Sequence, residues 1–346
     1  MIKLIKKIIR SNINKNRSNI DKSIEFKSSF LNKKNLTYFV KSFGNKNKNK
    51  IFYVIQRFRG GGMFSNLNFV LHHLLIAKKM GFVPIIDMKN FPTKYNEKNK
   101  VDNSLNAWDY YFHPINKYKL DEVYKSHCVI IVDGQTKKNP EFDTFSNLNN
   151  DHFEIYKKSV KFKSFLLREV NSFIKKNFFK EKVLGVHFRG TDMKTQERHP
   201  FPATPNQIIT LIDKELKRNK FTKIFLVTEE SKYIKILSKK FGGKLCFTKA
   251  FRSEKHNIFE QNSRKNHRFN IGKENIVDML LLSNTKKIIC TNSHLPDACR
   301  FINKNKKIKF IEINNGYNSN NILIAQYLWY IKKNLPSFLG GFKKKL

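Results

Sequence analysis

The stretch Val183-Leu-Gly-Val-His-Phe-Arg-Gly-Thr-Asp-Met-Lys194 passes from an apolar run directly into polar residues. The apolar run is typical of a buried strand, and the polar residues that follow predict a loop at its end. Ligands of open α/β sheets bind at the carboxyl ends of the strands, where an arginine fork can hold two phosphate oxygens. The pattern therefore predicts an anion site at Arg189. The alternative is a surface loop in which Arg189 and Asp192 only pair with each other.

Strand and helix patterns alternate on both sides of this stretch, so we predict an α/β fold with two Rossmann-like domains facing a cleft. The box Thr204-Pro-Asn-Gln207 marks the start of a helix over 205–219. The other expected strands are 51–55, 82–86, 128–132, 223–227, 244–247, 287–290 and 307–313, and the other helices are 66–80, 155–178, 231–241, 273–283, 295–304 and 320–333.

The expected domain organisation has four parts. Residues 1–50 are rich in Lys and Asn and are predicted to be a basic tail and connection. Residues 51–180 form an N-terminal Rossmann-like domain, and residues 181–315 form a C-terminal Rossmann-like domain. Residues 316–346 supply a helix that packs back across the first domain and a basic tail.

The chain is strongly basic, with 68 Lys+Arg against 27 Asp+Glu and a formal net charge of +41. Such a charge attracts polyanions, which include nucleic acid, an anionic membrane and a sugar nucleotide. The excess is spread along all 346 residues, however, and this also fits a global compositional bias. Most of the 32 phenylalanines fall within apolar patterns, which favours core positions over stacking platforms, so no nucleic acid is expected as a partner.

Cysteine spacing and apolar runs indicate the compartment. The four cysteines show no CxxC pair, so neither disulfides nor structural zinc is expected, and a reducing cytoplasm is the simplest setting. No apolar run reaches the roughly 20 residues of a spanning helix. Residues Met1–Arg10 could form a basic amphipathic helix that contacts an anionic membrane surface, with a frayed tail as the alternative. The expected location is the cytoplasm, with peripheral contact to the inner membrane surface.

The triplet Gly60-Gly-Gly62 follows the strand pattern 51–55 and precedes a helix that Ser65 can cap and Gly81 can end. A glycine loop at a helix start is an anion-binding arrangement in principle. The motif is weak, because neither GxGxxG nor the P-loop spacing is present. The aromatic run Trp108-Asp-Tyr-Tyr-Phe112 either lines a sugar site or belongs to the core.

Four segments in order resemble the fucosyltransferase superfamily that includes the nodulation and core α1,6 enzymes, the α1,2 enzymes and the protein O-fucosyltransferases. Gly185–Asp192 resembles the first signature, a strand that ends in His-x-Arg with an acidic residue shortly after. Ile224–Glu230 is similar to the second signature. The pair Asn275–Ser283 and Ile289–His294 is similar to the third, and the glycine loop to a donor-side loop ending in Asn66. Together the four segments cover roughly residues 51–305.

The resemblance implies a GT-B fold, GDP-fucose as donor, and inversion at the anomeric carbon without a bound metal or other cofactor. The chain contains no Asp-x-Asp triplet, the usual clamp for a metal on a diphosphate, so cationic side chains and amides are expected to neutralise the leaving group. The function implied is transfer of L-fucose to a glycan hydroxyl in surface polysaccharide synthesis. Two alternatives stay open: a GT-B transferase with another nucleotide sugar, and a basic nucleic-acid-binding protein.

The resemblance also assigns roles to residues. Arg189 would hold the β-phosphate of the donor, where a planar guanidinium suits the developing charge better than Lys. Asp278 would accept hydrogen bonds from the guanine edge. By the same resemblance, residues 181–315 would bind the GDP-sugar and residues 51–180 would be the acceptor-side domain. The remaining donor-side positions are His187 beside the sugar nucleotide, Ser293 and His294 against the phosphates, Thr228 of the second signature, and Gly60, Gly61, Gly62 and Asn66 as the floor from the other domain.

Each role has a structural alternative, and the chain departs from the family at several positions. His187 could be a satisfied strand-end histidine, Asp278 a helix-surface acid and Ser293 a simple N-cap. The core α1,6 enzymes carry a second arginine where Gly190 stands, and a lysine where Met193 stands, with Lys194 one step on.

Two carboxylates compete for the role of general base. Glu197 lies where the core α1,6 enzymes carry theirs, and Asp192 is the next candidate, because a carboxylate can take the acceptor's hydroxyl proton. Acceptor choice is expected to depend on the loops 90–125 and 251–270.

Overall fold

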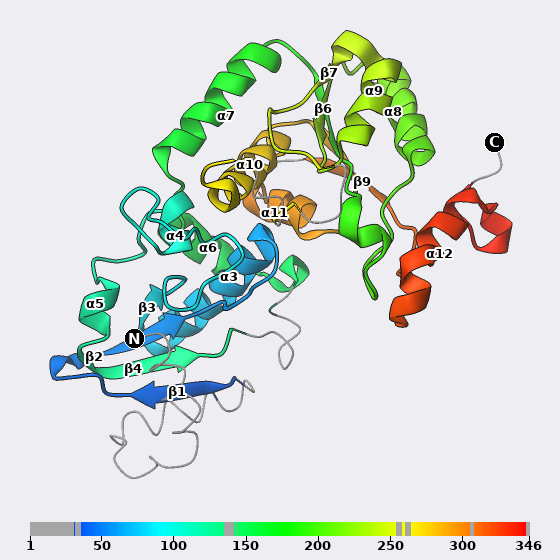
Figure 1. Cartoon of the computed structure of the whole chain (residues 1–346). Coiled ribbons are helices and arrows are strands. Elements are labelled where there is room, and N and C mark those ends of the chain that lie inside the picture. The colour runs from blue at the N-terminus through cyan, green and yellow to red at the C-terminus, as the bar shows by residue number, and fades with distance from the viewer. Residues whose placement is uncertain are drawn as a thin grey trace. The chain divides into compact units, whose positions relative to one another are not determined.

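The computed structural model describes residues 31, 36–134, 142, 144–253, 258–259, 264–304 and 308–343. They form two compact units that divide between Lys163 and Ser164, each built on its own sheet (Figure 1). This division lies before the boundary that we placed after residue 180. The predicted membrane-contact helix at residues 1–10 lies outside the described residues.

The first unit contains a mixed four-stranded sheet in the order β1-β4-β2-β3. Strand β2 (Lys46–Ile55) runs parallel to β3 (Val83–Ile86) and β4 (Ser126–Val132), and β1 (Tyr38–Lys41) pairs antiparallel with β4. The prediction that residues up to 50 form only a tail is therefore wrong for β1 and the start of β2. Their lysines and asparagines are tolerated because β1 is an edge strand and the first half of β2 is largely exposed.

The main helix of the first unit is α3 (Met63–Met80), which ends at Gly81 in the left-handed conformation, as predicted. It begins three residues earlier than expected, with Gly62 as its N-cap, so Ser65 lies in its first turn and is not the cap. The predicted helix 155–178 is two helices, α6 (Asn150–Ser159) and α7 (Ser164–Asn177), because the chain between them is extended and Phe162 pairs with Phe112. The shorter helices are α4 (Ala107–Tyr111), α5 (Leu120–Val123) and a 3₁₀ turn at Phe145–Asn147.

The second unit contains a parallel five-stranded sheet in the order β7-β6-β5-β8-β9. The strands are β5 (Val183–His187), β6 (Lys223–Val227), β7 (Leu245–Cys246), β8 (Lys287–Thr291) and β9 (Lys309–Ile313). The chain moves outward from β5 through β6 to β7 and then returns to place β8 on the other side of β5. The strand order thus reverses beside β5, which is the switch point where open α/β sheets bind ligands.

Helices of the second unit agree closely with the sequence patterns. Helix α8 spans Pro205–Asn219, and Thr204 and Gln207 form the predicted capping box. Helix α7 belongs to this unit, since Phe173 packs on Phe225 of β6 with ring centroids 5.4 Å apart. Helix α10 begins six residues earlier than predicted. The other helices are α9 (Ser231–Phe241), α10 (His267–Leu282) and α11 (His294–Ile302), with 3₁₀ turns at Thr191–Lys194, Gly242–Lys244 and Ser337–Leu339.

The last helix, α12 (Ile322–Asn334), packs on the second unit. Its Trp329 donates a hydrogen bond from Nε1 to the carbonyl of Pro202 at 3.0 Å and forms a small apolar cluster with Phe201 and Phe342. The buried side chains of this helix thus pack on the loop before α8. That the helix also packs back across the first domain stays a prediction. Among the described residues, no helix is both long and apolar enough to cross a membrane.

Candidate functional site

Three loops of the second unit leave the sheet at the same edge. Strands β6, β5 and β8 are parallel neighbours, so the residues that follow their carboxyl ends lie along one edge of the sheet. Arg189 follows β5, Thr228 follows β6, and Ser293 follows β8. The structure thus brings three of the predicted site residues to the switch point of one sheet.

Several polar atoms at this edge are buried without a hydrogen-bond partner among the described residues. They are Nδ1 of His187, Oγ1 of Thr291 and Oγ of Ser293. Leaving a buried polar group unpaired costs about 1–3 kcal/mol, so native folds retain few of them. Three such groups at the ends of two neighbouring strands indicate atoms held ready for a polar ligand.

Ser293 occupies the N-cap position of α11, but its hydroxyl makes no capping hydrogen bond. The alternative of a simple N-cap is therefore wrong for its side chain. The first amides of α11 follow directly, and a helix N-terminus favours anions through its free N–H groups and its dipole. His294 is the first residue of this helix. Thr291, the last residue of β8, was not predicted, although its position two residues before Ser293 was visible in the motif.

Arg189 is held between two carboxylates. Its Nη2 lies 3.1 Å from Oδ1 of Asp192, and its Nη1 lies 3.3 Å from Oε1 of Glu229. The pairing that we considered as the alternative is therefore present, with Glu229 as a second partner. The side chain of Arg189 remains 27 % exposed, so a ligand can still reach it. The two acids fix the guanidinium at the end of the central strand.

Arg189 lowers the pKa of both Asp192 and His187. Burial opposes ionisation of Asp192, but Arg189 and the hydroxyl of Thr191 outweigh it, so the pKa of Asp192 is below its ordinary value. Burial and the nearby charge of Arg189 lower the pKa of His187 to about 3. At neutral pH His187 is therefore an uncharged imidazole that can donate or accept one hydrogen bond but adds no positive charge.

Gly190, which replaces the second arginine of the core α1,6 pattern, is required by its neighbour Glu230. A Cβ at position 190 would lie 2.0 Å from Oε1 of Glu230. That carboxylate accepts hydrogen bonds from the amide of Thr191 and from Nζ of Lys194. Lys194 is buried, with its ammonium over the rings of Tyr233 and Trp329 at 4.8 and 5.2 Å. Through its contact with Glu230, this lysine therefore helps to fix the turn that begins at Thr191.

Asp278 lies on α10 and is buried, so the alternative of a helix-surface acid is wrong. Its Oδ1 accepts a hydrogen bond of 2.7 Å from Oγ1 of Thr248, in the segment that follows β7. Burial raises the pKa of Asp278 to about 7, although Thr248 and Arg252 act in the opposite direction. Asp278 therefore changes charge near neutral pH.

Arg252 is a residue of this region that the sequence analysis did not single out. Its Nη1 donates to the carbonyls of Thr248 and Ala250, whereas its Nε and Nη2 are buried without a hydrogen-bond partner in the described structure. Burial lowers its pKa, and Asp278 is the largest opposing influence. Only its position in the long polar segment 251–270 could have signalled a role.

Two other predicted residues have different surroundings. Glu197 is half-buried just after the 3₁₀ turn, and its carboxylate forms no hydrogen bond or ion pair within the described chain. Thr228 is buried, and its hydroxyl accepts a hydrogen bond of 3.2 Å from the amide of Glu230. Thr228 thus shapes the turn after β6, while Glu197 keeps its carboxylate available.

In the first unit, the glycine loop packs closely on the start of α3. A Cβ at Gly60 would lie 2.3 Å from Oδ1 of Asn66, and a Cβ at Gly61 would lie 2.7 Å from Oγ of Ser65. A Cβ at Gly62 would meet nothing within 4 Å. The first two glycines are therefore needed for packing, and only Gly62 faces open space.

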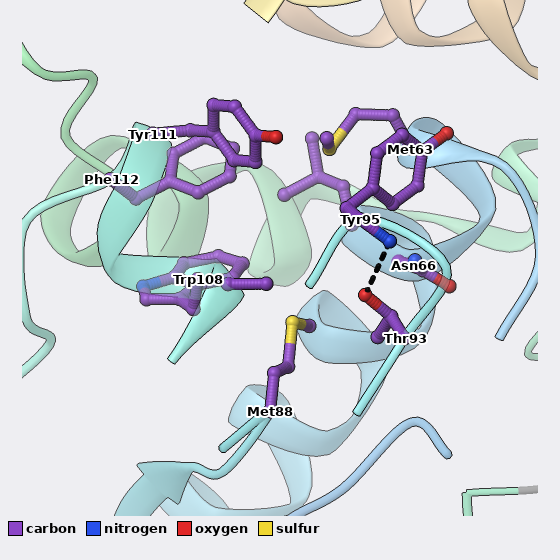
Figure 2. A pocket seen from close by; sticks show the side chains of 10 residues that line it. Met63, Asn66, Met88, Thr93, Tyr95, Trp108, Tyr111 and Phe112 are labelled. Atoms are coloured by element: carbon purple, nitrogen blue, oxygen red, sulfur yellow. Dashed lines mark hydrogen bonds between the residues drawn. The ribbon is translucent and has the colours of Figure 1, made fainter. Parts of the chain in front are cut away.

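A small pocket lies beside this loop (Figure 2). Asn66 is 3 % exposed and its Oδ1 has no hydrogen-bond partner in the described residues. The pocket is about 10 Å³, which is room for one water molecule and not for a sugar ring. Trp108, Tyr111 and Phe112 line it and are buried, so the aromatic run belongs mainly to the core.

A larger hollow of about 570 Å³ runs along the edge strand β3 of the first unit. Part of the loop 90–125 lines it, including Ser104, Asp109 and Tyr118. Its basic lining residues are Lys89, Lys100, Lys117 and Lys119. The hollow is large enough for a saccharide and carries more basic than acidic side chains.

Comparison with known proteins identifies the fold. No family model matches the sequence, and no curated protein matches it. A solved structure of the α1,6-fucosyltransferase NodZ, co-crystallised with GDP, matches 77 % of this chain and 96 % of its own, with a TM-score of 0.52 and 14 % identity. The fold is shared with NodZ. A second NodZ structure, soaked with GDP-fucose, matches 73 % of this chain and 92 % of its own, with a TM-score of 0.50 and 14 % identity.

A NodZ structure from Bradyrhizobium covers the same 73 % of this chain and 92 % of its own, at 15 % identity and a lower TM-score of 0.47. The predicted α/β class of GT-B type is confirmed by the likeness to NodZ.

Proposed function

We propose that this protein is a glycosyltransferase that moves L-fucose from GDP-fucose to a hydroxyl group of a glycan. The observation that carries the proposal is the set of unpaired buried atoms of His187, Thr291 and Ser293 beside Arg189, at the switch point of a NodZ-like fold. NodZ structures contain GDP or were soaked with GDP-fucose, which supports the same donor class here.

In this proposal, Arg189 faces the diphosphate of the donor. Negative charge grows on the β-phosphate as the glycosidic bond breaks, and a fixed guanidinium stabilises that charge without reorganisation. Asp192 and Glu229 hold the guanidinium in place. Ser293 and the first amides of α11 supply neutral donors, and the transfer proceeds with inversion and without a metal ion.

The guanine ring is proposed to bind between Asp278 and Arg252. Guanine presents N–H donors on its Watson–Crick edge, which a carboxylate accepts, and O6 and N7 acceptors, which an arginine fork can meet. The unpaired Nε and Nη2 of Arg252 support this arrangement. Uracil and cytosine lack the O6 and N7 pair, so the site favours GDP over UDP or CMP.

Glu197 is the better candidate for the base that takes the acceptor's proton. Asp192 has a lowered pKa and is paired with Arg189, and both make it a weak proton acceptor. Glu197 has no such partner within the described chain. Asp192 is therefore assigned a positioning role.

The acceptor is proposed to be a precursor of a surface polysaccharide, modified in the cytoplasm at the inner face of the membrane. The hollow lined by part of the loop 90–125 supports a saccharide acceptor, because its volume and polar lining suit a hydroxyl-rich molecule.

The decisive experiment incubates the purified full chain with GDP-fucose labelled in the sugar and measures release and transfer of the label. A parallel thermal-shift series with GDP, UDP, CMP and a short RNA separates the alternatives. Stabilisation by GDP together with donor turnover supports the proposal. Stabilisation by UDP or CMP alone would indicate another donor, and stabilisation by RNA alone would indicate a nucleic-acid-binding protein.

A further inference from the structure

Helix α12 turns its apolar side away from the unit on which it packs. Only Ala325 and Trp329 of this helix are buried. The side chains that recur at helical spacing on the opposite face are apolar and exposed, with Leu323 at 68 %, Tyr327 at 65 % and Ile331 at 54 %. A surface helix ordinarily shows the reverse pattern, with polar residues facing water.

The exposed apolar surface extends beyond this row. The residues of the α12 face are Ile322, Leu323, Ile324, Tyr327, Tyr330 and Ile331, and Phe338 and Leu339 in the following 3₁₀ turn are 71 % and 60 % exposed. Scattered exposed apolar residues are normal, but eight within eighteen residues form a continuous segment that predicts an interaction surface.

The basic residues near the α12 face indicate an anionic partner. Residues 313–346 contain no Asp or Glu and carry Lys332, Lys333 and the run Lys343-Lys-Lys345. Lysines at one end of an apolar helix, with tyrosines among the aliphatic residues, are typical of helices that lie in the interface of an anionic bilayer. A second copy of this chain is disfavoured, because the same basic residues would face each other in a protein of net charge +41.

We propose that the α12 face docks on the surface of an anionic phospholipid bilayer. The aliphatic side chains enter the boundary between headgroups and acyl chains, and the exposed Lys333 contacts lipid phosphates. Lys332 stays on the side that packs on the second unit, where its ammonium donates a hydrogen bond to the carbonyl of Gly340. The buried contacts of Trp329 with Pro202 and Phe201 then anchor the second unit to the membrane. This contact is distinct from the one predicted for residues 1–10.

The test measures co-sedimentation of the full chain with vesicles of phosphatidylcholine containing 0 or about 30 % phosphatidylglycerol, at low and high salt. We expect binding to the anionic vesicles, weakened by salt. The double variant Leu323→Glu, Tyr327→Glu places two charges on the α12 face, and we expect at least a tenfold loss of vesicle binding. GDP should raise the Tm of the double variant by as much as it raises the Tm of the parent chain, which also shows that the variant folds.

The matched control is Phe179→Glu. Phe179 is 68 % exposed, like Leu323, and lies beside Lys180 at the end of α7, away from the α12 sequence. This variant should bind vesicles like the parent chain. Equal loss in both variants, or no effect of the double variant, would overturn the proposal. So would a concentration-dependent dimer, measured by sedimentation velocity, that the double variant abolishes in the absence of vesicles.

Discussion

The two units contain similar junctions that differ in how their polar groups are paired. In the first unit, the glycine loop leads from β2 to α3, and in the second, Asn292 and Ser293 lead from β8 to α11. The first junction has the more suggestive sequence, with three glycines. The guanidinium of Arg57, however, already donates hydrogen bonds to the hydroxyl of Ser65 and to the carbonyl of Gly134. Two of the three glycines pack closely against the first turn of α3.

At the second junction, buried polar atoms lack hydrogen-bond partners in the described structure. Oγ of Ser293 and Oγ1 of Thr291 are buried and have no partner among the described residues. A glycine-rich loop at a helix start therefore does not by itself make a ligand site. Whether the local donors are already paired decides whether a ligand gains anything by binding there.

Replacing Arg189 tests the chemistry of the second junction. Arg189→Ala is expected to lower kcat/KM for fucosyl transfer by about 10²-fold or more, because it removes a fixed charge at the leaving group. Arg189→Lys should recover part of the activity, since it restores charge without the fork. The measurement is transfer of labelled fucose from GDP-fucose, and near-normal turnover in Arg189→Ala would remove this residue from the mechanism.

The pH dependence of GDP binding tests the proposed guanine site. If only ionised Asp278 accepts the guanine hydrogen bonds, a pKa of about 7 makes GDP bind about tenfold more weakly at pH 6 than at pH 8. Asp278→Asn should bind more weakly at pH 8 and lose this dependence. Isothermal titration at the two pH values gives both affinities, and a parent chain with equal affinities would place the base elsewhere.

Asp278 also makes stability depend on pH, in the opposite direction to a carboxylate that is paired with a cation. Its pKa is raised on folding, so the native state keeps a proton that the unfolded state releases between pH 4 and 7, and stability falls as pH rises through that window. Asp278→Asn should therefore raise Tm at pH 8 relative to the parent and change it little at pH 4. A lower Tm of the variant at pH 8 would show that the charged form is stabilised in the fold.

The unpaired hydroxyl of Ser293 and the paired hydroxyl of Ser65 give a direct contrast between the junctions. Ser293→Ala should weaken GDP binding by about 5- to 30-fold, the effect of one lost hydrogen bond to phosphate, without lowering Tm. Ser65→Ala removes one of the hydrogen-bond partners of Arg57 and should lower stability by about 1 kcal/mol without altering GDP affinity. The reverse result would mean that the first junction holds the donor.

Glycine substitutions compare how closely the loops of the two units pack. Gly190→Ala brings a Cβ against Glu230 and should cost about 1–3 kcal/mol of stability, whereas Gly62→Ala enters open space and should cost less than about 1 kcal/mol. Urea unfolding of both variants measures the difference. Equal costs would show that the Thr191–Lys194 turn can move away from Glu230.

Periodicity and capping determined much of the fold. The patterns at 205–219 and 223–227 correspond residue by residue to α8 and β6, because a capping box, a proline and an apolar run are local signals. Strand β1 was missed, because an edge strand with half-exposed residues is specified by its pairing with β4 and not by its own composition. The break between α6 and α7 likewise depends on the pairing of Phe162 with the distant Phe112.

The sequence by itself placed Arg189 after a central strand and Ser293 before a helix, because the residues that end a strand or begin a helix are fixed by local order. Only the tertiary structure showed that Arg189 is balanced by Glu229, that Gly190 is required by Glu230, and that Arg252 keeps unpaired donors near Asp278. The first two facts each join residues 40 positions apart, and the last joins residues 26 positions apart. Pairing and burial at such separations arise from packing of the sheet and its helices, which no local pattern encodes.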